Sequence, residues 1–211
     1  MNPHLLNITV GLLFIVVFGG LSFLRREGLS LQFALESLGV IAIIEAATLL
    51  TGIVINPIFF LMLIYLVSMR ARLLVDLANL LSARGRQRDA VKLLQLALRL
   101  FPERNTRLIV LVSMGIIQLR RKNPESAQSL LESVLEEAAD GGLSMKSESA
   151  CYYNLGLALQ RQGEEAKAIH HFNKAIDAFP TSIYGKAAGR ALEQWRSGQH
   201  KATEKSPGEA E

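Results

Sequence analysis

Charged residues are distributed unevenly along the chain. Between Leu5 and Met69 the charged residues are Arg25, Arg26, Glu27, Glu36 and Glu45. From Arg70 onward, charged residues are frequent. Such an abrupt change in solvent preference predicts two parts, an apolar part that favours lipid and a polar part of roughly 130 residues, long enough for one domain.

The apolar part predicts a transmembrane module over residues 1–70 with three helices. Residues 5–24 form an uncharged run that would be ~30 Å long as a helix, enough to cross a bilayer. A second run covers 35–55, and a third, 57–69, begins at Pro57, because proline suits the first position of a helix. The alternative is one kinked helix over 35–69, which at ~50 Å is longer than one bilayer requires.

Basic residues predict the orientation of these helices. With three spans, Arg25 and Arg26 lie on the same side of the membrane as Arg70 and Arg72. The positive-inside tendency makes that side cytoplasmic. We therefore expect the amino terminus outside and everything after Arg70 in the cytoplasm.

Glu45 lies in the middle of the second predicted span. A carboxyl group at that depth is costly unless it is neutral or has a partner. One interpretation is a proton or ion site, or a contact with a partner's membrane helix. The other is a neutral carboxyl group that bonds to Thr48, Thr9, Asn7 or Ser68 within the bundle.

The polar part contains an internal repeat. Two windows align without gaps at nine positions, which are Leu74, Leu77, Ala78, Leu81, Gly85, Ala90, Leu94, Ala97 and Pro102 in one and Tyr152, Leu155, Gly156, Leu159, Gly163, Ala168, Phe172, Ala175 and Pro180 in the other. The first four positions lie on one face of a helix, and the glycine suits a left-handed helix end. The next three positions form the inward face of a second helix, which the proline ends.

This pattern resembles the tetratricopeptide repeat (TPR), a helix–turn–helix unit. A third copy lies between the two windows, with its equivalent positions at Leu111, Met114, Gly115, Ala127, Leu131 and Val134. In that copy Asn123-Pro124 stands where the turn glycine is expected, and residues 140–149 are expected to form an extended loop. The resemblance implies an all-α protein in which the transmembrane helices precede an α-α superhelix. We expect a TPR domain over 71–197, with repeats at about 71–104, 108–141 and 149–182, a capping helix at 183–197, and a disordered tail at 198–211.

Residues 25–67 are similar to a prokaryotic family of small membrane proteins of unknown function, some of them encoded beside polyprenyl-phosphate glycosyltransferases. The similarity rests on the segment 25–31, on Gly52-Ile53, on Asn56 and on the segment 58–60. That family usually has a longer segment between its last two spans. The resemblance implies a location in the prokaryotic plasma membrane.

We expect no catalytic, cofactor-binding or metal site. Cys151 is the single cysteine, so neither an intramolecular disulfide nor a cysteine metal cluster can form. Phosphate-binding loops, zinc-protease helices and serine-nucleophile elbows are not found in the sequence. His170 and His171 would point about 100° apart on a helix, which makes a poor chelate. The basic stretch 84–107 has only Phe101 as an interleaved aromatic residue, so we expect a basic face near a negative membrane surface and no nucleic acid partner.

Stacked helix pairs bind partners mainly through the first helix of each pair. The residues expected on that face are Arg72, Asp76, Asn79, Ser113, Ile116, Arg120, Tyr153, Asn154, Leu157, Gln160 and Arg161. Their mixture of polar and apolar groups suits an extended peptide or a helix. Contact with the capping helix or the membrane module is the other interpretation. Only Asn79 matches the clamp with which some TPR co-chaperones hold a chaperone's carboxyl end, so a chaperone-tail receptor is not expected.

The sequence therefore predicts a membrane-anchored TPR adaptor, not an enzyme. It would bind a protein partner at the cytoplasmic membrane face and help to assemble a membrane complex. The alternative is an accessory subunit of a membrane enzyme, such as a lipid-linked glycosyltransferase, with Glu45 at the helix contact. Because Leu74 follows Met69 after one helical turn, the two parts are joined without a linker, which favours a partner at or in the membrane.

Overall fold

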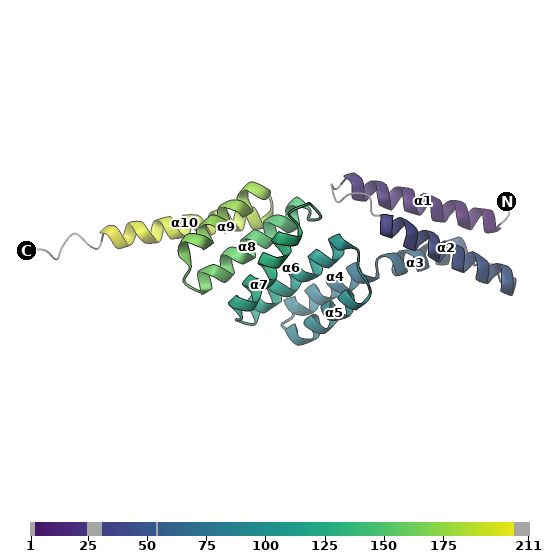
Figure 1. Ribbon diagram of the computed structural model, residues 1–211, viewed down its shortest axis with the longest axis horizontal. Helices are drawn as coiled ribbons and strands as arrows, with labels where there is room; N and C mark the ends of the chain where they lie inside the picture. Colours follow the sequence, from purple (N-terminus) through teal and green to yellow (C-terminus); the bar gives the residue numbers. More distant parts are fainter. Residues whose placement is uncertain (1–2, 25–30, 54, 205–211) are drawn as a thin grey trace, which may run out of the picture. The chain divides into compact units, whose positions relative to one another are not determined.

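The computed structural model describes residues 3–24, 31–53 and 55–204 (Figure 1). This part of the chain forms ten α-helices and no strand, which confirms the all-α prediction. The helices are α1 Pro3–Leu24, α2 Leu31–Thr51, α3 Pro57–Ser68, α4 Arg70–Ala83, α5 Gln87–Arg99, α6 Arg104–Arg120, α7 Pro124–Glu137, α8 Met145–Arg161, α9 Glu165–Ala178 and α10 Ile183–Glu204. The chain divides into two compact units, Met1–Arg107 and Leu108–Glu211, and each is described by itself.

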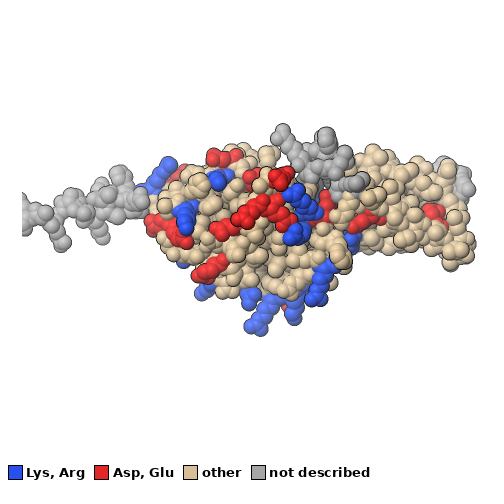
Figure 2. All heavy atoms as spheres, in the orientation of Figure 1, with Lys and Arg blue, Asp and Glu red and all other residues tan. Residues whose placement is uncertain are grey.

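Helices α1, α2 and α3 pack on one another in the first unit. Their shared core consists of Phe14, Ile41, Ile44, Phe60 and Ile64. The outer surface of these helices is also largely apolar, and the face of them seen in Figure 2 carries few charged side chains. The large apolar residues on that surface include Leu12, Val16, Leu35, Ile43, Leu50, Ile58 and Phe59. These helices therefore carry large apolar residues both in their shared core and on their outer surface.

The connection from α2 to α3 is a short turn. Gly52 follows α2 with a φ of 71°, a left-handed conformation that ends the helix. The Asn56 side chain then accepts a hydrogen bond from the Ile58 N–H, and Pro57 occupies the first turn of α3, as predicted. Helix α2 begins and ends four residues earlier than the predicted 35–55, and its earlier end follows from the left-handed conformation of Gly52.

Only part of this region is long enough to cross a bilayer by itself. Among the described residues, the segment Gln32–Thr51 has the length and hydropathy of a membrane span, whereas the apolar stretch His4–Gly20 of α1 is shorter. Helix α3 has 12 residues and a length of ~18 Å, so it qualifies only together with α4, from which it is bent by 71°. The three-span topology stays a prediction, and Arg25 and Arg26 lie outside the described residues.

The first repeat consists of α4 and α5, which pack along each other. Ala78, Ala90, Leu94 and Ala97 are fully buried, as the repeat pattern predicts. The prediction is wrong for Leu77, which is 45% exposed. The remaining buried positions of α4 are Ala71, Val75 and Ser82.

The second and third repeats consist of α6–α7 and α8–α9. In each, a glycine of the first helix receives a large side chain of the second. A Cβ on Gly115 would lie 2.9 Å from Leu131, and one on Gly156 would lie 2.7 Å from the ring of Phe172. The two members of each pair are 16 positions apart, the same separation as Ala78 and Leu94 in the first repeat. The middle repeat therefore follows the predicted frame.

The turns inside the repeats share a left-handed residue. Gly85 and Gly163 have φ angles of 79° and 80° in the first and third repeats. In the middle repeat the left-handed residue is Lys122, with a φ of 64°, and not Asn123, which the sequence indicated. Pro124 begins α7 after this turn.

Two segments differ from the expected boundaries. The predicted loop 140–149 is shorter, because the Ser144 hydroxyl accepts a hydrogen bond from the Ser147 N–H and caps α8 at Met145. Helix α10 continues to Glu204, so it includes the first part of the predicted disordered tail. The rest of that tail, 205–211, lies outside the described residues.

Candidate functional site

In the second unit, the candidate partner face lies on α8 and the start of α10. Tyr153, Leu157 and Gln160 recur at four and three residues, so they share one face of α8. The Tyr153 ring lies 5.9 Å from that of Phe172 and 6.1 Å from that of Tyr184 on α10, measured between ring centroids. Both tyrosines are half-buried, which leaves part of each ring available to a ligand.

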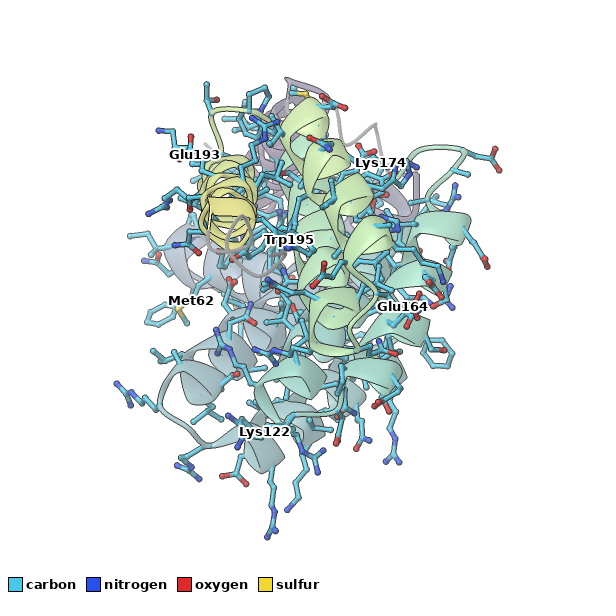
Figure 3. All side chains as sticks on the ribbon, turned by 90° about the vertical axis from the view of Figure 1, so that its left-hand side faces the viewer. Met62, Lys122, Glu164, Lys174, Glu193 and Trp195 are labelled. Atoms are coloured by element: carbon cyan, nitrogen blue, oxygen red, sulfur yellow. The ribbon has the colours of Figure 1, made fainter. Side chains whose placement is uncertain are left out.

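Helix α10 completes this unit by covering α8 and α9. Trp195 lies on the side of α10 toward α9 and packs against the core, whereas Glu193 is exposed on the other side (Figure 3). The sequence predicted this helix as a cap but did not indicate that Tyr184 is part of the partner face. An aromatic residue in its first turn, next to the exposed Ile183, is the signal that could have located it.

Several predicted partner-face residues are accessible. In the second unit, Ile116 and Leu157 are half-buried, and Arg120 and Gln160 are exposed. In the first unit, Asp76 and Asn79 are exposed on α4, and Arg72 is half-buried with interactions of its own.

Three predicted residues do not serve as free partner contacts. Ser113 and Asn154 are each only 5% exposed, and the Asn154 amide donates to the Ala150 carbonyl of its own helix at 2.7 Å. The exposed Arg161 donates through Nη1 to the Leu119 carbonyl near the end of α6. Ser113 is thus buried, and the Asn154 and Arg161 side chains bond to backbone carbonyls of the fold, which the repeat pattern does not reveal.

Comparison with family models identifies the repeats. Two models described as tetratricopeptide repeat match the chain, one over residues 70–101 and the other over residues 106–181. The protein belongs to the tetratricopeptide-repeat family. A comparison with curated proteins found no match. TPR domains are protein-interaction modules and are generally not catalytic.

A second cluster in the TPR domain surrounds His171. Its ring stacks on Tyr152 at 6.0 Å between centroids, and Lys174 Nζ lies 5.5 Å from the centre of the Tyr152 ring. Burial lowers the pKa of His171, and the neighbouring charges of His170 and Lys174 lower it further. Burial also raises the pKa of Tyr152, as does the Glu148 carboxylate. His171 is therefore mainly a neutral packing group.

The chemistry available in the TPR domain is limited. The rings of His170 and His171 lie edge-on at 5.3 Å, and no group of three metal-ligating side chains is found among the described residues. Cys151 is buried, and its thiol donates to the Leu131 carbonyl. Burial, with a contribution from Glu148, raises the pKa of this thiol to about 12, so it is a poor nucleophile.

Glu45 has its partners within the apolar bundle. It is 7% exposed, and its Oε2 lies 3.0 Å from His4 Nδ1 and 3.4 Å from Thr48 Oγ1. Thr48 was among the predicted partners, whereas His4 was not. The other carboxylate oxygen, Oε1, is buried without a hydrogen-bond partner among the described residues.

The remaining predicted partners of Glu45 bond elsewhere. Thr9 donates to the Leu5 carbonyl of its own helix, and Ser68 pairs with Ser37 at 3.1 Å. The buried Asn7 donates through Nδ2 to the Ile55 carbonyl at 3.2 Å. Asn7 therefore joins α1 to the α2–α3 turn and the Ser37–Ser68 pair joins α2 to α3, whereas Thr9 bonds only within α1.

A polar clamp joins the apolar helices to the first repeat of the TPR domain. Arg70 Nη1 lies 2.7 Å from Glu36 Oε2 of α2, and Arg70 Nη2 donates to the Leu100 carbonyl after α5 at 3.0 Å. Gln32 of α2 donates to the Phe101 carbonyl at 3.1 Å. The start of α2, the start of α4 and the end of α5 are thereby held together.

Proposed function

We propose that this protein is a membrane-anchored TPR adaptor, in which α1–α3 hold the chain in the bilayer and the TPR domain binds a protein partner at the cytoplasmic face. One observation carries the proposal. The family match begins at residue 70, and only Met69 separates α3 from α4. An apolar helical bundle thus passes directly into a protein-interaction module.

The surface of α1–α3 supports the membrane location. Large apolar residues are exposed on all three helices, and they include Val16, Ile43, Leu50 and Ile58. Soluble proteins rarely expose apolar area of this extent, since burying it in a partner or a membrane is favourable. The buried polar groups Asn7, Ser37, Glu45 and Thr48 face the bundle interior, as expected of polar residues in lipid.

The orientation remains part of the proposal. Arg70 and Arg72 follow α3 directly, so the positive-inside tendency assigns the TPR domain to the cytoplasm and, with three spans, the amino terminus to the outside. The resemblance of residues 25–67 to a prokaryotic family favours the prokaryotic plasma membrane. A reporter enzyme fused after Ser197 should be active only if the TPR domain is cytoplasmic.

The partner is expected to contact the α8 face. Tyr153 and Tyr184 are half-buried aromatic residues that also carry a hydroxyl group, a combination common at binding hot spots. Leu157 and Gln160 continue the face along α8, with Ile116 and Arg120 on α6 in the same unit. The direct connection at Met69 and the clamp at Arg70 keep the first repeat at the membrane, which favours a partner located there as well.

Affinity purification from detergent tests this assignment. The variant Gln160→Glu/Leu157→Ala changes one exposed and one half-buried side chain of the face. We expect it to lose a protein that the wild type retains. The control variant Asn173→Glu alters an exposed position on α9 and should retain that protein. Equal recovery with both variants would exclude this face as the binding site.

The accessory-subunit alternative depended on Glu45 facing a helix of a membrane enzyme, such as a lipid-linked glycosyltransferase. Glu45 instead contacts His4 and Thr48 in its own bundle. If a membrane enzyme copurifies with the wild type but not with Glu45→Leu, and is unaffected by the α8-face variant, the accessory role would replace the adaptor role.

A further inference from the structure

Helix α4 has apolar residues on two opposite faces. One face is buried and contains Ala71, Val75, Ala78 and Ser82. Leu73, Leu77 and Leu80 lie about 180° around the helix from that face and are 36%, 45% and 48% exposed. Their spacing of four and three residues places them in a single row, which we call the leucine stripe.

The leucine stripe lies at the beginning of a helical repeat array. In such an array each repeat covers its neighbour, and the end repeats need a cover of their own. At the carboxyl end, α10 packs over α8 and α9. At the other end the preceding helix is α3, which departs from α4 at 71° and leaves the stripe exposed.

We propose that the leucine stripe lies on the surface of an anionic lipid bilayer, with its side chains inserted at the boundary between headgroups and acyl chains. This inference rests on the proposed membrane anchor and adds a second membrane contact. Helix α4 would then be an interfacial helix as well as the first helix of the TPR domain.

The bend at Met69 gives α4 a suitable direction. If α3 runs along the bilayer normal, a 71° bend leaves α4 within about 20° of the membrane plane. Over its 14 residues, a length of ~21 Å, α4 then departs from the plane by only about 7 Å. That departure is comparable to the ~5–10 Å depth to which interfacial helices insert their apolar side.

The charges around α4 complement an anionic surface. Arg84, Arg86, Arg88 and Lys92 are exposed at the turn after α4 and on the first part of α5. Asp89 is the acidic residue among them, and it is paired with Arg86 at 2.7 Å. Arg84 follows α4 directly, and basic residues close in sequence to an apolar stripe favour binding to anionic lipids. Asp76 lies about 60° from the row, where it can reach water.

Fluorescent labels on single cysteines test this contact in the full chain. In a Cys151→Ala background, an environment-sensitive label is attached to Leu77→Cys in the stripe or to Asn79→Cys, a matched exposed position on another side of α4. A third variant, Ile43→Cys, places the label on the exposed surface of α2 and reports on the anchor itself. Each protein is reconstituted into vesicles of phosphatidylcholine and phosphatidylglycerol. A nitroxide at a shallow acyl position quenches from the lipid, and iodide quenches from the water.

The inference predicts strong lipid quenching at Ile43 and Leu77, with iodide quenching severalfold stronger at Asn79 than at Leu77. Lipid quenching at Ile43 together with iodide quenching at Leu77 would overturn the inference and leave the anchor intact. Protection of Leu77 from both quenchers would also overturn it, since a second copy or another protein would then cover the stripe. Iodide quenching at Ile43 would instead contradict the anchor on which the inference rests.

Discussion

The guanidinium group of Arg70 lies 2.7 Å from the carboxylate of Glu36. These residues are 34 positions apart, and each is the charged residue nearest to the junction on its own helix, α4 or α2. Arg70 also donates to the Leu100 carbonyl, so one side chain holds together a helix of the apolar bundle and both helices of the first repeat. The orientation of this repeat against the bundle therefore depends strongly on Arg70.

Replacing Arg70 should loosen this junction. We expect Arg70→Ala to destabilise the packing of α4 and α5 on α2 by about 1–2 kcal/mol, because Glu36 and the Leu100 carbonyl both lose a charged donor. Hydrogen exchange at the start of α4 and the end of α5 would measure the change. Arg84→Ala, at an exposed position, is the control and should leave the exchange unchanged. Equal protection in both variants would show that the clamp adds no stability.

The turn of the middle repeat should be improved by glycine. Lys122 has a φ of 64°, a conformation that a side chain disfavours and glycine accepts. We expect Lys122→Gly to stabilise the TPR domain by about 1 kcal/mol, because the backbone strain at this turn is removed. The entropic cost of ordering a more flexible glycine residue on folding reduces this gain. Denaturant titration measures the gain. Gly163→Ala, at the equivalent turn of the third repeat, should have the opposite sign, and a loss of stability in both variants would contradict this account.

Adding a methyl group at Gly156, where Phe172 packs, should destabilise the TPR domain. The Cβ of Gly156→Ala would lie 2.7 Å from the ring, so we expect a loss of about 1–3 kcal/mol on thermal or denaturant unfolding. The double variant Gly156→Ala/Phe172→Leu recreates the Ala78–Leu94 pair of the first repeat and should recover part of the loss. Gly189→Ala is the control, because a Cβ there meets nothing within 4 Å and alanine favours the helix. A loss as large at Gly189 would point to a backbone effect.

The half-buried His171 should make stability dependent on pH. The pKa of His171 is lower in the folded state than its usual value of 6.5, so near pH 6 the unfolded chain binds more protons than the folded chain. Its contribution to stability is therefore present above about pH 6.5 and decreases as the pH falls below that value. His171→Gln should remove this dependence in denaturant titrations at several pH values. His170→Gln should retain most of it, since burial of His171 is the larger cause, and equal profiles for the two variants would contradict the assignment.

The sequence predicted the fold because the features that define a repeat are local. Small residues such as Gly115 and Gly156 recur at fixed distances from Leu131 and Phe172, and these pairs form the contacts inside each helix pair. Pro57 likewise marked the start of α3, because its ring fixes the backbone of the first helical turn.

The features that the sequence did not predict depend on contacts between distant segments. Leu77 has the spacing of a core residue, but burial requires a neighbouring helix that α3 does not supply. Asn154 has the position of a ligand contact, yet its amide bonds to the Ala150 carbonyl. The pairing of Glu36 with Arg70 was missed for the same reason, because the two residues are 34 positions apart.

If α1–α3 span a bilayer as proposed, the single residue between α3 and α4 makes the first repeat sensitive to that bilayer. Apolar helices adjust their tilt when the hydrocarbon layer becomes thinner or thicker. Only Met69 lies between α3 and α4, and Arg70 is bound to α2, so α4 would rotate together with the apolar helices. A tilt of these helices by about 10° would displace the far end of α4, ~21 Å away, by about 4 Å. The direction in which the adaptor presents its first repeat would then vary with membrane thickness.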